Sequence, residues 1–179
     1  MRVLVDACVL YPTVMREVVL GLAQAGCFEV RWSARIMEEW ALAARKLGPA
    51  GEVQARGEIA QVQARFPGAM VAAQPGLEAR LWLPDPADVH VLAAAVAGSA
   101  DMILTANAKD FPRGILAEEG VERCDADQLA LRCLDSDPDM VAQVAGAVLA
   151  EARLLSGQDW TLRGLLKKAR MPRLGKALA

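Results

Sequence analysis

An almost entirely apolar segment between two acidic turns constrains the fold of this chain most strongly. Residues 83–112 read LPDPADVHVLAAAVAGSADMILTANAKDFP, and nothing charged lies between His90 and Ser99. A helix that is apolar almost all round is a buried helix. The following residues 102–105 (MILT) predict a buried strand. We therefore expect a helix and a strand of one core, with carboxylates at both ends of the segment.

The two carboxylates before this helix have different predicted roles. Asp85-Pro86 is typical of an N-cap followed by proline at the first helical position, where the missing N–H costs nothing. Asp88 lies three, four and seven residues before apolar positions, so it starts the inward face of the helix. We expect Asp85 to act only as a cap and Asp88 to face the interior.

The first 125 residues alternate short apolar runs with longer amphipathic segments, which is typical of a parallel α/β sheet. The expected strands are residues 2–5, 28–32, 70–73, 102–105 and 121–122. The expected helices are residues 13–25, 34–47, 50–66, 77–81, 86–97, 126–134, 138–155 and 160–170. Ser33, Asp125 and Asp137 are the expected N-caps of three of them. Periodicity places Leu47 and Val53 on inward faces and Arg16 and Glu17 on an outer face.

The composition limits the possible chemistry. The chain has 179 residues, of which 54% are hydrophobic, and is long enough to bury a substantial core. No apolar run approaches the roughly 18 residues of a membrane span, and no signal region opens the sequence, so a cytoplasmic location is the default. His90 is the only histidine, which argues against zinc sites and histidine-based catalysts. We expect His90 to be a partly buried helix residue without a catalytic role.

The four cysteines have no C-x-x-C spacing: Cys8, Cys27, Cys124 and Cys133. We interpret them as ordinary buried or half-buried thiols. The four tryptophans are expected to be core or interface anchors rather than platforms for base stacking: Trp32, Trp40, Trp82 and Trp160. Any chemistry must therefore come from carboxylates.

Four acidic side chains are candidates for a common site. Asp6 ends the first strand, Glu39 borders the inner face of helix 34–47, and Asp88 and Asp110 flank the buried segment. Carboxylates that converge without Lys or Arg partners repel one another, and a divalent cation relieves that repulsion. An all-oxygen ligand set favours Mg²⁺ or Mn²⁺ over zinc. Such a site polarises a phosphoryl oxygen and activates water, which is the chemistry of phosphodiester hydrolysis.

Simpler interpretations of these acids stay open. Asp6 can instead cap the next helix. Glu38, which is nearly opposite the apolar face that Glu39 borders, is expected to be merely solvated. Asn107 follows the strand that ends at Thr105 and offers a neutral oxygen as well as an amide N–H pair.

Three segments resemble the PIN domain, the nuclease fold of the VapC-like toxins in toxin–antitoxin pairs. They are LVDACVLYP, WSARIMEEW and residues 83–112, and the resemblance spans about residues 1–112. By this resemblance, four residues match the acidic catalytic quartet of the family: Asp6, Glu39, Asp88 and Asp110. Metal-ligand roles are implied for three of them, Asp6, Asp88 and Asp110, and supporting roles for Thr105 and Asn107. Whether residue 107 or residue 110 supplies the fourth member stays open.

The same resemblance implies a three-layer α/β/α fold with a mainly parallel sheet and metal-dependent endoribonuclease activity with Mg²⁺ or Mn²⁺. It also implies frequent homodimerisation and a small antitoxin partner. We predict a PIN-like nuclease domain at residues 1–124 and a C-terminal helical extension at residues 125–179, packed on or continuing that domain.

Two other classes of protein share part of this pattern. A phosphotransferase of the haloacid dehalogenase type also uses an Asp after its first strand, but it needs a second Asp two residues later, where this chain has Cys8. A receiver-like or catalytically inactive PIN-like binding module is the second class. It does not explain why all the acids are present.

Basic residues concentrate at the C-terminus. Six of the 20 Lys and Arg residues, and none of the 22 Asp and Glu residues, lie from Arg163 onward. Contact with a polyanion and a merely solvated terminus explain this equally well. The candidates for contact with RNA phosphates are Lys167, Lys168, Arg170 and Arg173.

Overall fold

A five-stranded parallel sheet organises the structure, a computed structural model that describes all 179 residues. The strand order is β3-β2-β1-β4-β5, and every neighbouring pair is parallel. The strands are β1 (Arg2–Val5), β2 (Glu29–Ser33), β3 (Met70–Val71), β4 (Met102–Leu104) and β5 (Glu122–Cys124). The predicted α/β class is confirmed, and the sheet with its helices is consistent with a three-layer α/β/α fold.

The chain divides into two compact units. The first comprises Met1–Tyr11 and Glu29–Cys124 and contains the whole sheet, whereas the second comprises Pro12–Phe28 and Asp125–Ala179 and is helical. The helices of the first unit are α1 (Ala7–Leu10), α3 (Ala34–Ala43), η1 (Ala44–Leu47), α4 (Pro49–Arg65), α5 (Pro75–Arg80), η2 (Pro86–Asp88), α6 (Val89–Ala97) and α7 (Arg113–Glu118). Those of the second are α2 (Thr13–Gln24), α8 (Ala126–Ser136), α9 (Pro138–Ser156), α10 (Leu162–Lys168) and α11 (Pro172–Ala177). A nuclease domain at residues 1–124 with a separate extension stays a prediction.

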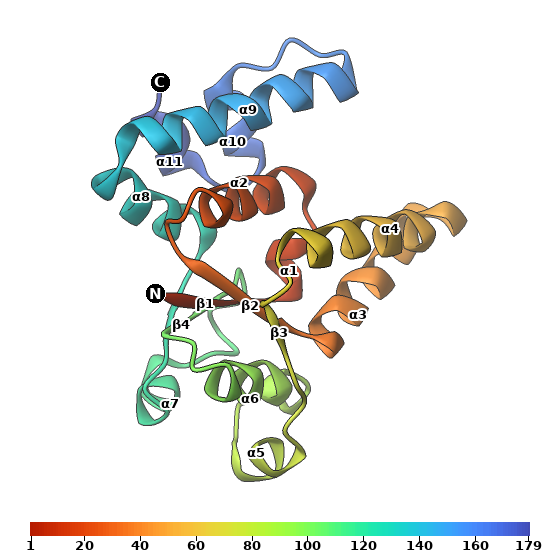
Figure 1. Cartoon of the computed structure of the whole chain (residues 1–179), viewed down its shortest axis with the longest axis vertical. Helices are drawn as coiled ribbons and strands as arrows, with labels where there is room; N and C mark the ends of the chain where they lie inside the picture. Colours follow the sequence, from red (N-terminus) through yellow and green to blue (C-terminus); the bar gives the residue numbers. More distant parts are fainter. The chain divides into compact units, whose positions relative to one another are not determined.

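The strand order reverses direction between β1 and β4. Chain order runs outward from β1 through β2 to β3, then returns to the other side of β1 for β4 and β5. Because crossover connections are right-handed, helices that precede and follow this return cover opposite faces of the sheet. Helix α6 packs on β1, β2 and β4, and Figure 1 shows it with α5 on one side of the sheet. Ligands of such sheets bind outside the carboxyl ends of the strands at the reversal point, here the ends of β1 and β4.

The predicted all-round burial of the central helix is confirmed. All six residues from His90 to Ala95 in α6 are buried. The predicted caps are also present, because the Ser33 side chain accepts a hydrogen bond from the Ile36 N–H and Asp85 accepts one from the Ala87 N–H. The backbone of residues 85–97 is therefore positioned by one local cap and one buried helix.

In the second unit, α2 packs against α8, α9 and α10. A disulfide joins Cys27, just after α2, to Cys133 in α8. The interpretation of all four cysteines as thiols is therefore wrong for this pair, whereas Cys8 and Cys124 are outside any disulfide. Spacing rules failed because the two partners are 106 residues apart and meet only through helix packing.

Three predicted side-chain orientations are also wrong. Arg16 is buried at 2% exposure, with its Nε 3.3 Å from Glu17 Oε1. Leu47 is 72% exposed because the helix tightens into the 3₁₀ turn η1 at Ala44, which changes the direction of later side chains. Val53 is 73% exposed because α4 buries a stripe on another face: Gly51, Ala55, Ile59 and Val62.

The tryptophans divide between the core and the surface. Trp32 and Trp40 are fully buried, as expected of core anchors, whereas Trp82 is 65% exposed. None of the helices combines the length and the hydropathy that a membrane crossing requires.

Candidate metal centre

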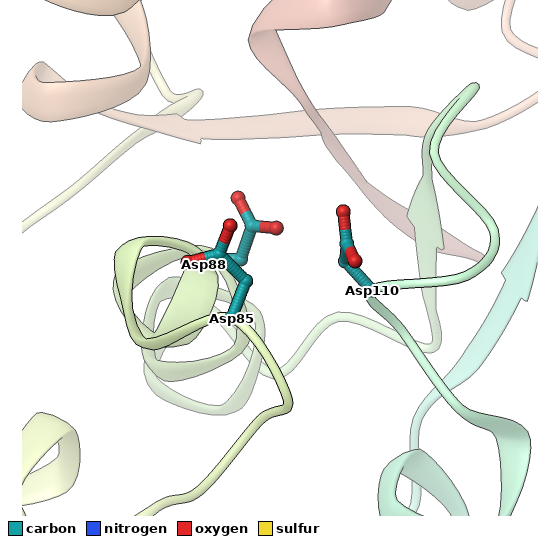
Figure 2. Close-up of side chains that lie close together, drawn as sticks. All are labelled: Asp85, Asp88 and Asp110. Atoms are coloured by element: carbon teal, nitrogen blue, oxygen red, sulfur yellow. The ribbon is translucent and has the colours of Figure 1, made fainter.

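Three aspartates converge in the first unit. Asp85 and Asp88 flank the turn η2 before α6, and Asp110 lies in the loop after β4. Each offers a carboxylate oxygen, and these oxygens all lie within 4.8 Å of one another. Figure 2 shows Asp85 and Asp88 on the helical turn and Asp110 on the loop that faces it. The turn before α6 and the loop after β4 therefore build one acidic cluster together.

Asp6 is held at the reversal point of the sheet. It follows β1 directly, and its backbone N–H donates to the carbonyl of Leu104 in β4 at 3.0 Å. Its Oδ2 accepts hydrogen bonds from Thr105 Oγ1 at 2.7 Å and from Cys8 Sγ at 3.0 Å. The side chain is 8% exposed and makes no capping bond to α1, so helix capping does not explain it. Its second oxygen accepts no hydrogen bond from the chain.

The electrostatics of Asp88 connect these acids. The pKa of Asp88 is raised from 3.8 to about 6, first by burial and then by neighbouring negative charges. In order of decreasing effect, those charges belong to Asp6, Asp85, Asp110 and Glu39. The other three predicted acids, Asp6, Glu39 and Asp110, are thus within electrostatic reach of Asp88, and the ionised form of Asp88 is destabilised at this position.

Cys8 supports Asp6 as a protonated thiol. Burial and the Asp6 charge raise the pKa of the Cys8 thiol to about 12. A thiol that holds its proton is a hydrogen-bond donor and a poor nucleophile. Cys8 therefore acts beside Thr105 as a donor to the same oxygen of Asp6.

Glu39 lies at the margin of the cluster. Its charge has the smallest of the four effects on the pKa of Asp88. Its Oε1 lies 2.8 Å from His90 Nε2 and 3.6 Å from Arg35 Nε. Glu38 instead pairs with Arg56, with both carboxylate oxygens accepting from the guanidinium. Glu38 is therefore on the surface, as predicted, but ion-paired.

Asn107 orients Asp110. The Nδ2 group of Asn107 donates to Asp110 Oδ2, while the Asn107 backbone N–H donates to Thr105 Oγ1 at 3.0 Å. The structure thus brings Asp110 into the cluster and places Asn107 behind it as a donor.

Sequence reasoning gave Asp85 too small a role. Its Oδ1 caps η2 through the Ala87 N–H at 2.9 Å, as predicted, but its carboxylate also belongs to the cluster. The available signal was its spacing of three residues from Asp88, which brings two side chains of a helical turn together.

The donor set fits a hard divalent cation. In three acids, one carboxylate oxygen accepts a hydrogen bond from a donor of the chain and the other accepts none: Asp6, Asp85 and Asp110. No Lys or Arg pairs with Asp6, Asp85, Asp88 or Asp110, so their mutual repulsion is not neutralised within the chain. Oxygen ligands on several carboxylates suit Mg²⁺ or Mn²⁺.

The basic residues of the C-terminus lie in the second unit. Lys167 and Lys168 end α10, and Arg170 and Arg173 follow; all four are exposed. Lys168 Nζ lies over the Trp160 ring at 4.8 Å from its centroid. None of the four pairs with a carboxylate, so their charges are open to an external anion.

Comparison with known proteins gives one match. The PIN domain family model matches residues 2–109, which contain β1 to β4 and every acid described above except Asp110. No curated protein and no solved structure matches the chain significantly.

Proposed function

The chain belongs to the PIN domain family, and from this premise we propose that it is a metal-dependent endoribonuclease. PIN domains are generally nucleases. The observation that carries the proposal is the cluster of uncompensated acids at the reversal point of the sheet, where burial and then the neighbouring carboxylates raise the pKa of Asp88 to about 6. Repulsion between carboxylates lowers the stability of the metal-free fold, and a bound cation relieves this repulsion, which favours binding of the cation.

We assign the acids by their surroundings. Asp6, Asp88 and Asp110 would hold Mg²⁺ or Mn²⁺, with Asp85 beside them. When bound, the cation would polarise a phosphoryl oxygen and lower the pKa of water. Thr105 and Cys8 hold Asp6 in place, and Asn107 holds Asp110.

Glu39 has a different role in the proposal. Its side chain is 37% exposed, and it is the most weakly coupled of the acids around Asp88. We assign to it the acceptance of a proton from the attacking water, because a carboxylate that is open to solvent can pass this proton on.

RNA cleavage by the purified protein tests the proposal. Wild-type protein with Mn²⁺ or Mg²⁺ is expected to cleave single-stranded RNA, and EDTA is expected to stop it. Asp6→Asn keeps the shape and an acceptor oxygen for Thr105 but removes the charge, so it should abolish cleavage. Glu38→Gln is the matched control, because Glu38 pairs with Arg56 outside the cluster, and it should cleave like wild type.

Two outcomes would contradict the proposal. Cleavage by Asp6→Asn protein at the wild-type rate would show that the acids do not form the catalytic site. Wild-type protein that binds Mn²⁺ by calorimetry but cleaves no RNA would support the alternative function, a catalytically inactive PIN-like or receiver-like binding module.

The cellular role that we propose is that of a VapC-like toxin of a type II toxin–antitoxin system, acting on RNA in the cytoplasm. Such a toxin would bind a small antitoxin protein and commonly form homodimers. The basic residues Lys167, Lys168, Arg170 and Arg173 would then contact RNA phosphates. Co-expression with the product of the adjacent gene tests the role: a toxin should arrest growth alone and co-purify with its antitoxin when both are expressed.

A further inference from the structure

His90 is the one buried side chain of α6 that polar chemistry, rather than packing, must explain. It is 4% exposed and stands two residues after Asp88. Its Nε2 lies 2.8 Å from Glu39 Oε1, although neither ring nitrogen has a hydrogen bond of good geometry. Buried polar atoms without partners are rare and costly, so an apolar residue would fill this position more favourably.

We propose that His90 is a positioning residue that holds Glu39 at the edge of the acidic cluster. The inference rests on the proposed nuclease function, in which Glu39 takes part. A carboxylate only accepts hydrogen bonds, so Nε2 must carry the hydrogen that faces Glu39. At 2.8 Å only the direction of the N–H group is unfavourable, and a small reorientation on metal or substrate binding would complete the hydrogen bond.

Arg35, the other residue that contacts Glu39, does not fix the position of its carboxylate. Arg35 lies 3.6 Å away through Nε, its side chain is 54% exposed, and it is shared with Glu78 at 3.9 Å and with the Ala87 carbonyl at 3.4 Å. An exposed ion pair between two long side chains fixes their geometry only weakly. His90, by contrast, is fixed by the packing of α6, the helix whose N-cap is Asp88. It therefore ties Glu39 on α3 to the segment that carries Asp88 and Asp85.

Polar groups also lie beside the ring of His90. The residue lines a cavity of about 60 Å³ together with polar side chains that include Ser33 and Gln74, although both ring nitrogens themselves are buried. A buried ring with a carboxylate next to Nε2 and a polar cavity beside it is suited to orienting that carboxylate. Residues that orient the acids of a metal site typically change metal affinity or activity about 10- to 100-fold when removed.

Three substitutions separate positioning from packing. His90→Met is apolar and of similar length, so it removes the donor while filling the space. His90→Gln keeps an amide N–H that reaches a similar position. His90→Asn is the second variant without the donor, for use if His90→Met does not fold, because its shorter amide stays polar but does not reach Glu39. Each is made in wild-type and Glu39→Gln backgrounds and checked by thermal melting.

The readouts are kcat and KM for single-stranded RNA and the Mn²⁺ dissociation constant from calorimetry. We expect His90→Met to lower kcat about 10- to 100-fold with little change in KM or in Mn²⁺ affinity, because Glu39 is not among the acids assigned to the cation. His90→Gln should recover most of the loss. In the Glu39→Gln background, His90→Met should add little further change, because the group that it positions has already been altered.

A merely structural His90 would give another pattern. Folded His90→Met or His90→Asn protein with wild-type kcat would overturn the inference, as would equal effects of His90→Met in both backgrounds. A wild-type protein that neither binds Mn²⁺ nor cleaves RNA would instead refute the proposed function, and the positioning role would fall with it. The wild-type measurements therefore distinguish the two failures.

Discussion

Replacing Asp88 by asparagine should stabilise the protein near neutral pH when no cation is present. The pKa of Asp88 is raised from 3.8 to about 6, which at roughly 1.36 kcal/mol per unit corresponds to a penalty of about 3 kcal/mol on the ionised carboxylate. Because this carboxylate is only partly buried, solvent screening reduces the penalty to about 1–2 kcal/mol. Asparagine keeps the shape and removes the charge, and therefore removes the penalty.

A smaller term opposes this gain. Asp88 stands at the N-cap of α6, where the loss of a negative charge costs about 0.3–1 kcal/mol. The net gain is then about 0–1.7 kcal/mol, which for a chain of this size raises the Tm by up to about 7 °C.

The pH dependence gives a second signature. The folded pKa of Asp88 is higher than its unfolded value, so the folded state binds the extra proton between about pH 4 and 6. The contribution of Asp88 to stability is therefore fully present below about pH 4 and is lost as the pH rises through about 6. The Asp88→Asn protein lacks this loss, so its advantage over wild type should grow from pH 4 to pH 7.

Thermal melts with EDTA and with Mn²⁺ measure all of these effects. At 100 times its dissociation constant, Mn²⁺ should stabilise wild type by about 2.7 kcal/mol and the variant much less. Asp125→Asn is the control, because Asp125 caps α8 outside the cluster and asparagine caps equally well, so its Tm should not rise. A lower Tm for metal-free Asp88→Asn protein, together with no Mn²⁺ effect on wild type, would refute the reasoning and show that the acid is structural.

Three further predictions concern the second unit. Replacing Lys167, Lys168, Arg170 and Arg173 by alanine should weaken RNA binding and reduce the dependence of the binding constant on salt concentration. Fluorescence anisotropy at low and high salt measures both effects, and unchanged binding would show that the terminus is merely solvated. Reducing the Cys27–Cys133 disulfide, or replacing both cysteines by serine, should lower the free energy of unfolding by about 2–4 kcal/mol in urea denaturation. The variant without both cysteines should then not respond to reductant, whereas Cys124→Ser keeps the disulfide and should respond as wild type does. Asp127→Ala should lower the free energy of unfolding by about 2 kcal/mol, because this buried carboxylate of α8 accepts hydrogen bonds from the Arg173 and Leu174 N–H groups at the start of α11. Asp135 is an exposed residue of α8, and Asp135→Ala should leave the free energy of unfolding nearly unchanged in the same urea denaturation.

The parts of the fold that follow from local pattern were predictable. All five strands lie within or next to the predicted ranges, because buried parallel strands are short apolar runs bounded by turns. The helix starts at Ser33, Asp85, Asp125 and Asp137 agree with their predicted caps, since a cap depends only on residues two or three positions away.

The parts that depend on distant partners were not predictable. Helix α11 is a short segment with few apolar residues, and its first N–H groups are satisfied by Asp127, which precedes them by more than 40 residues in the chain. The Cys27–Cys133 disulfide likewise depends on the packing of α2 against α8. Burial of Arg16 has the same origin, because helical periodicity identifies one apolar stripe and not a second face that another helix covers.

For the candidate site, periodicity placed Asp88 correctly on the inward side but treated every carboxylate as having a single role. A carboxylate has two oxygens, and here they are used separately. The chain holds one oxygen of Asp6 through Thr105, one of Asp85 through the Ala87 N–H and one of Asp110 through Asn107. An acid that is fixed through one oxygen loses little further freedom when the other binds a ligand, so the structural bond prepares the functional one. A capping bond is therefore no reason to exclude an acid from a site, and in this chain it is what keeps Asp85 within 4.8 Å of its neighbours.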